Sequence, residues 1–256
     1  MDSGIGGLTV LKQITRLMPD ESFIFVGDQK NLPYGEKSTE EVKSFAERIA
    51  DYLLKRNIKM FVIACNTATA AAYEYLKEKL PVPVIGVIQP GSEEAVSVTK
   101  NNRIGIIATN GTIKSHIYEK TVSRIDPGVK TFGLGCPEFV SLVESGQAGT
   151  TKSFKEVSDQ LKFFAGKDID TLILGCTHFP VLTKEIIKAV SDDVRLVDPG
   201  VSAGMQVQDY LTKHDMLASP SQAKTGNFYT TGNVSKFVEV ANEVLGKKIV
   251  AEHLDL

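Results

Sequence analysis

Three cysteines, Cys65, Cys136 and Cys176, are the residues of this chain best suited to nucleophilic or acid–base chemistry. Cys65 and Cys176 each follow an apolar run and precede small polar residues, which predicts a strand that ends and a turn that opens a helix. Ligand sites of parallel sheets lie at such strand ends, and a helix N-terminus favours a thiolate. For either cysteine alone, an inert buried thiol is the commoner alternative. Two thiols at equivalent places instead suit proton removal from one face of a carbon and delivery to the other.

These two cysteines occupy matching positions of an internal repeat, and the repeat includes the strands and helices around them. The matching segments, first half then second, are Phe61–Thr67 with Leu172–His178, the helix before Cys65 with Ser153–Ala165, Val84–Val87 with Arg195–Asp198, and Pro90-Gly91 with Pro199-Gly200. Four elements in the same order predict a duplicated α/β unit. Cys136 lies outside this repeat and precedes a proline, so we expect it to have a packing role.

The repeat also predicts a strand at the start of the first half. In the second half a strand at Arg103–Ala108 runs into the polar turn Thr109–Thr112 and then a helix. The equivalent turn of the first half is Asp2–Gly7, and only Met1 precedes it. We therefore expect a first strand of about five residues to be absent here, with stability or activity lower than in a chain that has it.

Strands and helices alternate along the chain, which predicts parallel sheets covered by helices. The clearest helix is Thr39–Arg56, with an apolar face and a capping box formed by Ser38 and Glu41. The predicted strands are Ser22–Gly27, Met60–Ala64, Val82–Val87, Arg103–Ala108, Lys130–Gly133, Thr171–Leu174 and Val194–Val197. In the C-terminal part we expect a helix at Ser202–Thr212, a polar loop at Ser219–Gly226, a strand at Phe228–Thr231 and a helix at Val234–Leu245.

This tail has no partner in the repeat, and we expect it to pack back onto the first half. The predicted domains are a first α/β lobe of residues 1–91 completed by 206–256, and a second α/β lobe of residues 92–205. If the lobes face each other across a pseudo-two-fold axis, the two thiols meet from opposite sides of one cleft.

Composition excludes several classes of protein. Of 256 residues, 42% are hydrophobic and 23% charged, which is typical of globular proteins and excludes disorder. A net charge of −2 lacks the basic excess of a nucleic-acid-binding protein. The apolar runs are too short to span a membrane, and no signal peptide opens the chain. An odd number of unpaired cysteines argues against a disulfide framework and favours a reducing cytoplasmic setting.

Other motifs predict little chemistry. Asp2–Gly7 can present backbone amides to an anion, but Thr9 stands where a dinucleotide fingerprint has its third glycine. Gly200–Gly204 matches the Gly-x-Ser-x-Gly pattern of hydrolases, yet the serine does not follow its strand directly. The four histidines show no metal-ligand spacing, so we expect no metal site, and only His178 lies beside a candidate site.

Four motifs together resemble those of bacterial glutamate racemase, within the aspartate/glutamate racemase superfamily. They are Asp-Ser-Gly-Ile-Gly-Gly at 2–7, Pro-Tyr-Gly at 33–35, Cys-Asn-Thr-Ala at 65–68 and Gly-Cys-Thr-His at 175–178, and the resemblance spans essentially the whole chain. It implies two similar α/β lobes with the active site in the cleft between them. It also implies racemisation of glutamate without a cofactor, supply of D-glutamate for peptidoglycan synthesis, and a homodimer.

The resemblance assigns roles to particular residues. Cys65 would deprotonate D-glutamate and Cys176 would deprotonate L-glutamate. Asp2 would support Cys65, and His178 with Glu144 would support Cys176. The implied substrate contacts are Asp2, Ser3, Tyr34, Gly35, Asn66, Thr67, Thr177 and His178, and Asp28 matches a further acidic position near the site.

Physical chemistry agrees with thiols in this role. The α-hydrogen of an amino acid is very weakly acidic, and a thiol, whose ordinary pKa is ~8.5, can be brought towards the working pH by its surroundings. Two alternatives stay open at this stage. One is a sister activity such as aspartate racemase. The other is a two-lobed module that binds an amino acid without turning it over, although such a module needs no pair of thiols.

Overall fold

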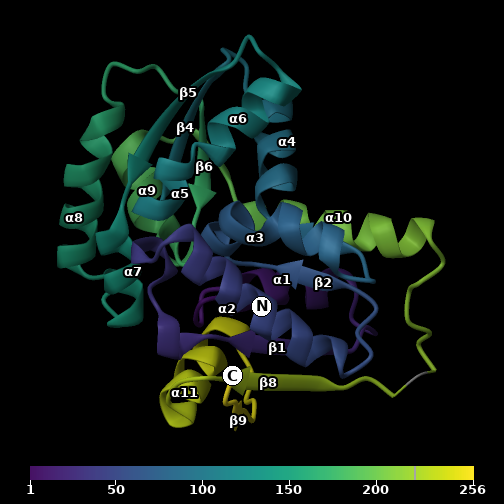
Figure 1. The fold of residues 1–256 in the computed structure, drawn as a ribbon. Helices are drawn as coiled ribbons and strands as arrows, with labels where there is room; N and C mark the ends of the chain where they lie inside the picture. Colours follow the sequence, from purple (N-terminus) through teal and green to yellow (C-terminus); the bar gives the residue numbers. More distant parts are fainter. Residues whose placement is uncertain (222) are drawn as a thin grey trace. The chain divides into compact units, whose positions relative to one another are not determined.

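The computed structural model describes residues 1–221 and 223–256, and its chain divides into two compact units. The first unit consists of Met1–Val87 and Gly200–Leu256, and the second of Ile88–Pro199. In both units helices and strands alternate and every strand pairing is parallel (Figure 1). The predicted α/β class with parallel sheets is therefore confirmed.

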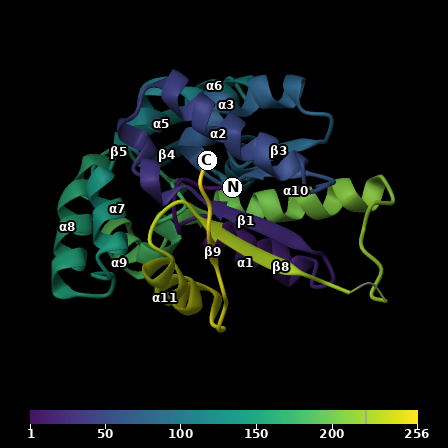
Figure 2. The same cartoon turned by 60° about the horizontal axis from the view of Figure 1, so that its bottom comes forward.

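The elements of the first unit come from both ends of the chain. From the N-terminal part they are α1 Leu8–Leu17, β1 Phe23–Gly27, η1 Gln29–Asn31, η2 Tyr34–Glu36, α2 Thr39–Leu54, β2 Phe61–Ile63, α3 Asn66–Lys79 and β3 Val84–Gly86. From the C-terminal part they are α10 Pro199–Lys213, β8 Gly226–Thr230, α11 Val234–Leu245 and β9 Glu252–His253. All of α10 except its first residue, Pro199, belongs to this unit. The C-terminal strand β8 lies beside β1 in register, and β9 pairs with β8 (Figures 1 and 2). The predicted polar loop at 219–226 includes residue 222, which lies outside the described residues, and β8 begins at Gly226.

Two layers of helices cover the sheet strands of the first unit. On one face, α2 and α3 pack with Val26, Phe61 and Ile63. On the other face, α1, α10 and α11 pack with Phe25, Ile85 and neighbouring residues. Helix α2 begins at the predicted capping box, in which the Ser38 and Glu41 side chains bond to each other's backbone N–H groups.

The first two residues join two groups of strands. Strands β1, β8 and β9 form one sheet and β2 with β3 another. The Asp2 N–H donates to the Val26 carbonyl of β1, and the Met1 amino group donates to the Val62 carbonyl of β2. Met1 and Asp2 therefore lie between β1 and β2 and bond to both.

The second unit is built around one sheet with the order β5-β4-β6-β7. Its elements are α4 Ile88–Val98, β4 Arg103–Ala108, α5 Asn110–Ser115, α6 Ile117–Ile125, β5 Lys130–Gly135, α7 Pro137–Glu144, α8 Thr151–Leu161, η3 Lys162–Phe164, β6 Thr171–Gly175, η4 Phe179–Leu182, α9 Thr183–Val190 and β7 Arg195–Val197. Helices α7, α8 and α9 cover one face, and α4 contacts both β6 and α6.

Matching the two units strand by strand corrects the sequence analysis at Cys136. Strands β1, β2 and β3 correspond to β5, β6 and β7, with Met1–Asp2 in the place of β4. The Asp28 N–H donates to the Asp2 carbonyl after β1, and the Cys136 N–H donates to the Ala108 carbonyl after β5. Cys136 thus lies on the repeat, at the position that Asp28 occupies in the first unit.

Candidate active site

The Cys65 site is built where β2 ends and α3 begins. Cys65 is the N-cap residue of α3, and its sulfur accepts a hydrogen bond from the Ala68 N–H at 3.4 Å. Its S–H group donates to Ser3 Oγ at 3.7 Å. A sulfur at this end of a helix faces the unpaired N–H groups of the first turn, which favour negative charge. The local sequence therefore gives Cys65 a setting in which a thiolate is stabilised.

The glycine-rich turn that precedes α1 lies against this thiol. Asp2 is fully buried, and its Oδ2 accepts a hydrogen bond from the Gly4 N–H at 2.9 Å. One backbone amide of the turn is therefore bonded to the Asp2 carboxylate. A Cβ atom at Gly7 would stand 2.3 Å from the Asp2 Cβ, which only glycine avoids. Burial lowers the pKa of the Met1 amino group to about 6, although the negative charges of Asp2 and Cys65 oppose this. The charges of Asp2 and Cys65 therefore both act on the Met1 amino group.

A second buried carboxylate, that of Asp28, organises the tyrosine beside this site. It accepts hydrogen bonds from the Tyr34 hydroxyl at 2.6 Å, from Thr231 Oγ1 at 2.7 Å and from the Asn31 side-chain amide. Burial raises the pKa of Tyr34, and the negative charges of Asp28, Cys65 and Asp2 raise it further. Tyr34 is thus fixed as a neutral phenol near Cys65.

The Cys176 site is built at the corresponding end of β6 in the second unit. The Cys176 N–H donates to the Leu174 carbonyl at 2.8 Å, and a 3₁₀ turn, η4, comes before the α-helix that follows. A Cβ atom at Gly175 would stand 2.8 Å from the Ile107 carbonyl oxygen and 3.1 Å from the Tyr118 ring. Glycine therefore lets the strand approach its neighbours directly before the thiol.

His178 connects Cys176 to a carboxylate. Its Nδ1 lies 3.7 Å from the Cys176 sulfur, and its Nε2 donates to Glu144 Oε1 at 2.7 Å. Burial by itself would lower the pKa of His178, but its hydrogen bonds with Cys176 and Glu144 and their negative charges outweigh burial and raise it to about 10. At neutral pH His178 is therefore an imidazolium that holds a proton within reach of the sulfur.

Comparison with known proteins gives these two sites a family. The family model for Asp/Glu/Hydantoin racemase matches residues 6–207. The glutamate racemase of Pediococcus pentosaceus is 44% identical over 256 residues, which is 100% of this chain and 97% of that protein, and the enzyme of Enterococcus faecalis is 45% identical over 96% of this chain and 90% of its own. The chain belongs to the glutamate racemase family.

Solved structures of the family agree with the fold. The crystal structure of glutamate racemase isoform RacE1 from Bacillus anthracis matches with a TM-score of 0.96 at 40% identity, covering 100% of this chain and 96% of that one. Glutamate racemase from Francisella tularensis, solved in complex with D-glutamate, matches with a TM-score of 0.93 at 33% identity and the same coverage. An aspartate racemase from Picrophilus torridus shares only the fold, at 18% identity and a TM-score of 0.59.

The residues expected from the family resemblance form two groups, one in each unit. The group of the first unit comprises Asp2, Ser3, Tyr34, Gly35, Cys65, Asn66 and Thr67, all buried except the half-buried Gly35. The group of the second unit comprises Glu144, Cys176, Thr177 and His178, of which Glu144 is half-buried. Cys136 is fully buried in the core of the second unit, where burial raises its pKa and keeps its thiol protonated.

Sequence reasoning missed several residues of these groups. Thr231 reaches Asp28 from a segment 203 positions further along the chain, and no local motif marks it. Tyr118 is buried, and burial is the main reason why its pKa is raised. The negative charges of Asp198 and Cys176 raise this pKa further, so Tyr118 belongs to the surroundings of the second thiol.

Two classes of site find no support in the part of the chain that the structure describes. Among residues 1–221 and 223–256, no group of three or more histidine, cysteine or acidic side chains is arranged to hold a metal ion. Within the same residues, no helix combines the length and apolarity needed to cross a membrane.

Proposed function

We propose that this chain interconverts L-glutamate and D-glutamate by proton transfer at the α-carbon, with Cys65 and Cys176 as the two acid–base groups and no cofactor. One observation carries the proposal: at equivalent places of the repeat, each unit ends a strand in a buried cysteine that has its own polar partners. Identities of 44% and 45% to glutamate racemases over most or all of the chain support glutamate as the substrate.

The chemistry needs one sulfur on each face of the substrate. The Cys65 thiolate takes the α-proton of D-glutamate, so the C–H bond breaks, its electron pair is delocalised into the carboxylate, and an S–H bond forms. The Cys176 thiol then gives its proton to the opposite face of the carbon and becomes a thiolate. The reverse reaction starts with deprotonation of L-glutamate by Cys176. We propose that residues 1–91 with 206–256 and residues 92–205 are two lobes related by a pseudo-two-fold axis, with the substrate in the cleft between them.

The partners of each thiol have different tasks in this mechanism. Asp2 and Ser3 orient and polarise Cys65, since Ser3 accepts its S–H and Asp2 fixes the turn that carries Ser3. His178, held by Glu144, stabilises negative charge on the Cys176 sulfur or returns its proton. General acid–base groups of this kind each contribute ~10²–10⁴ in rate.

The anionic substrate and the developing carbanion require donors that converge on them. Hydroxyl, amide and backbone N–H groups near the two thiols fit this need because they stabilise charge in a water-poor site. The residues we propose for substrate binding are Asp2, Ser3, Tyr34, Gly35, Asn66, Thr67, Thr177 and His178.

The proposed product suggests a role in the cell. D-glutamate is a component of peptidoglycan, so the enzyme would serve cell-wall synthesis and cell shape. Because the mechanism depends on reduced thiols, we propose that it works in the cytoplasm. We also propose a homodimer, which light scattering on the purified protein tests by its mass.

Two other functions are less well supported. The aspartate racemase that shares this fold is only 18% identical, far below the glutamate racemases. A module that binds an amino acid without turning it over would need neither Cys65 nor the His178–Glu144 pair beside Cys176.

Incubation of the protein with L-glutamate in D₂O tests the proposal. We expect the optical rotation to fall to zero and the D-glutamate formed to carry deuterium at the α-carbon, with little reaction of aspartate. Cys65→Ser and Cys176→Ser should each lower racemisation at least about a hundredfold. Cys136→Ser is the matched control, because this thiol is buried in the apolar core of the second unit and burial raises its pKa, and it should keep activity.

Three outcomes would contradict the proposal. The absence of exchange with any amino acid, from a folded protein, would favour the binding module. Racemisation of aspartate at least as fast as glutamate would favour the sister activity. Survival of near-normal activity in either serine variant of Cys65 or Cys176 would exclude the two-base mechanism.

A further inference from the structure

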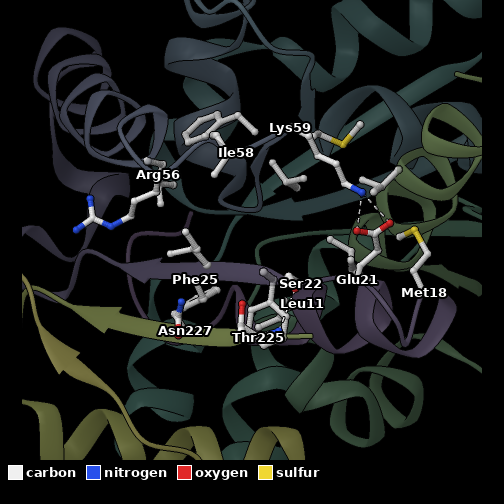
Figure 3. A pocket seen from close by; sticks show the side chains of 18 of the residues that line it. Leu11, Met18, Glu21, Ser22, Phe25, Arg56, Ile58, Lys59, Thr225 and Asn227 are labelled. Carbon is white, nitrogen blue, oxygen red and sulfur yellow. Dashed lines mark hydrogen bonds and ion pairs between the residues drawn. The ribbon is translucent and has the colours of Figure 1, made fainter. Parts of the chain in front are cut away.

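Two glutamates outside the thiol sites are shielded from water, and only one of them is paired with a cation. Glu21 lines a cavity of about 720 Å³ in the first unit, and its side chain, 10% exposed, forms an ion pair of 2.7 Å with Lys59 (Figure 3). Glu185, in the first turn of α9, is 2% exposed and has no ion pair with any residue of the described ranges, 1–221 and 223–256. A buried carboxylate without a cation depends on its hydrogen-bond donors.

Both donors to Glu185 come from the point at which the chain enters α8. The Gly149 N–H donates to Glu185 Oε1 at 2.6 Å, and the Ser153 hydroxyl donates to the same oxygen at 2.8 Å. Ser153 is fully buried in the first turn of α8, and its N–H donates to the side chain of Thr150, the N-cap of that helix. The carboxylate of α9 therefore fastens the connection between α7 and α8.

Backbone hydrogen bonds join this connection to the carboxylate that holds His178. Glu144 is the last residue of α7. The Gln147 N–H donates to the Leu142 carbonyl at 2.9 Å, and the Gln147 carbonyl accepts from Thr150 Oγ1 at 2.8 Å. The last turn of α7, which carries Glu144, is thus bonded through the connection to the start of α8.

The other side of the anchor begins at the histidine. His178 is the N-cap of η4, α9 follows η4 directly, and Glu185 lies in the first turn of α9. The segment from Glu144 to Gly149 and the segment from His178 to Glu185 are therefore joined twice. One join is the 2.7 Å hydrogen bond between Glu144 and His178, and the other is the 2.6 Å hydrogen bond between Gly149 and Glu185. In such a closed ring, each join keeps the groups of the other at a high effective concentration.

The place of Glu144 in its helix does not by itself favour the hydrogen bond to the imidazole. A negative side chain at a helix C-terminus lies at the negative end of the helix dipole, which costs ~0.3–1 kcal/mol. Holding a long side chain in one rotamer costs up to ~2 kcal/mol more. The ring contact between Phe139 and Phe179 also joins α7 to η4, but it lies in the first turn of α7 and not at its end. The end that carries Glu144 therefore needs an anchor of its own.

We propose that Glu185 is a positioning residue of the second thiol site, which fixes the connection between α7 and α8 and thereby keeps Glu144 within hydrogen-bonding distance of His178. Its own hydrogen bonds go to Gly149 and Ser153, so it acts through the connection and not on the imidazole. This inference rests on the roles of Glu144 and His178 in the proposed racemisation. Its test needs no turnover, because the protonation of His178 reports whether Glu144 is in place.

Two substitutions separate the reach of this side chain from its charge. Glu185→Gln removes the charge but keeps an oxygen that can accept from both donors, because Gly149 and Ser153 bond to the same oxygen, Oε1. Glu185→Asp keeps the charge but is one methylene shorter, which withdraws the carboxylate by ~1.5 Å from both donors. If reach is what matters, Glu185→Asp loses the function and Glu185→Gln retains it.

The protonation of His178 is followed by NMR of the substrate-free protein with ¹⁵N-labelled histidine. Its signal is the one that is absent from the His178→Gln protein. Loss of a neighbouring opposite charge lowers the pKa of a histidine by ~1–3 units. We therefore expect the pKa of His178 to fall from about 10 by at least about one unit in Glu185→Asp, which is about a tenfold weaker hold on the proton. In Glu185→Gln it should stay close to the wild-type value.

Asp170→Ala is the matched control for a general loss of stability in the same unit. Asp170 accepts from Thr99 Oγ1 at 2.6 Å and from the backbone N–H groups of Lys100 and Asn101 at 2.6 and 2.8 Å. It precedes β6, whereas the thiol site follows the other end of that strand. We expect Asp170→Ala to lower the free energy of unfolding and to leave the pKa of His178 unchanged.

A double variant shows whether Glu185 acts through Glu144. In the Glu144→Gln background the charge that Glu185 holds in place is already gone. Adding Glu185→Asp should therefore change the pKa of His178 much less than it does in the wild type. A full additional fall would mean that Glu185 acts by another route, and it would overturn the proposal.

Three other outcomes would overturn the proposal. They are an unchanged pKa of His178 in folded Glu185→Asp, an equal fall in Glu185→Gln, and an equal fall in Asp170→Ala. If Glu185→Asp does not fold, Ser153→Ala takes its place, because it removes one donor from the other side of the contact. It should lower the pKa of His178 as well, and no change would refute the role of the contact. Because the titration is read without substrate, an inactive protein with the expected titration would contradict the proposed racemisation alone.

Discussion

Replacing Glu144 by glutamine tests the electrostatics of the second thiol site. The His178 side chain is 3% exposed and the Glu144 side chain 17%, so their 2.7 Å hydrogen bond is largely shielded from water. Glutamine retains an oxygen that can accept from His178 Nε2 but removes the negative charge. We therefore expect the pKa of His178 to fall from about 10 towards its usual value near 6.5 in the Glu144→Gln protein.

The magnitude follows from the link between pKa and stability. A rise from 6.5 to about 10 corresponds to ~5 kcal/mol of stabilisation of the folded state. Because the folded-state value is the higher one, this stabilisation is complete below pH 6.5 and is lost as the pH rises through about 10. Hydrogen bonds to charged groups contribute ~1.5–3 kcal/mol, so we assign ~2 kcal/mol of the total to the Glu144 charge.

Urea unfolding of the wild type and the Glu144→Gln protein at pH 6 and pH 10.5 measures this contribution. We expect the free energy of unfolding to be ~2 kcal/mol lower in the variant at pH 6 and the difference to shrink at pH 10.5, where His178 is largely neutral in both proteins. Asp159→Asn is the control, because its ion pairs with Lys155 and Lys162 are exposed and should matter little at either pH. An equal loss of stability at both pH values, or none at pH 6, would refute the assignment of a charged His178.

The same variant makes a kinetic prediction. L- and D-glutamate have equal free energies, so kcat/KM must be the same in both directions for any variant. If protonated His178 assists Cys176, the ~2 kcal/mol assigned to the Glu144 charge makes kcat/KM of Glu144→Gln about fourfold lower than that of the wild type at pH 9, and closer to it at pH 7. A constant ratio between pH 7 and pH 9 would show that Glu144 acts only through structure.

Three further predictions concern other parts of the two sites. Tyr34→Phe removes the hydroxyl that donates to Asp28, so urea unfolding should show a loss of ~1–3 kcal/mol, and unchanged stability would contradict the role of this network. Gly175→Ala places a Cβ 2.8 Å from the Ile107 carbonyl, so we expect ~1–3 kcal/mol lower stability and reduced racemisation, and normal values of both would refute this. Cys136 is buried and burial raises its pKa, so mass spectrometry after iodoacetamide treatment of the native protein should find it unmodified, whereas rapid alkylation would refute its burial.

Most elements of the fold were predictable because their signals are local. The predicted helix at Val234–Leu245 is α11, and the predicted strand at Arg103–Ala108 is β4. No helix was predicted at α4, which begins at Ile88 and contains Pro90 and Gly91 in its first turns, and these two residue types have the lowest helix propensities. The short strand β9, Glu252–His253, has an exposed polar sequence and forms only by pairing with β8, which no sequence window contains.

The candidate site was predictable only where neighbours in the chain are neighbours in space. Cys176 and His178 belong to one motif and lie together. Glu144 was placed beside His178 by family resemblance, and the hydrogen bond between them spans 34 positions. The equivalence of Asp28 and Cys136 was missed because Asp28 precedes Cys65 by 37 residues whereas Cys136 precedes Cys176 by 40, so a fixed offset does not align them.

That equivalence explains how a duplicated unit can hold two thiols in different surroundings. At the position after β1, Asp28 is a buried carboxylate with three hydrogen-bond donors, whereas after β5 the same position is an apolar thiol in the core. The site of the first unit therefore contains the carboxylates of Asp2 and Asp28. The site of the second unit instead contains His178 and Glu144, which both follow Cys136 in the chain. In the two-base mechanism that we propose, one sulfur is a thiolate when the other is a thiol, and unlike surroundings favour such a difference in protonation. We infer that divergence at this position of the repeat contributes to this difference between the two thiols.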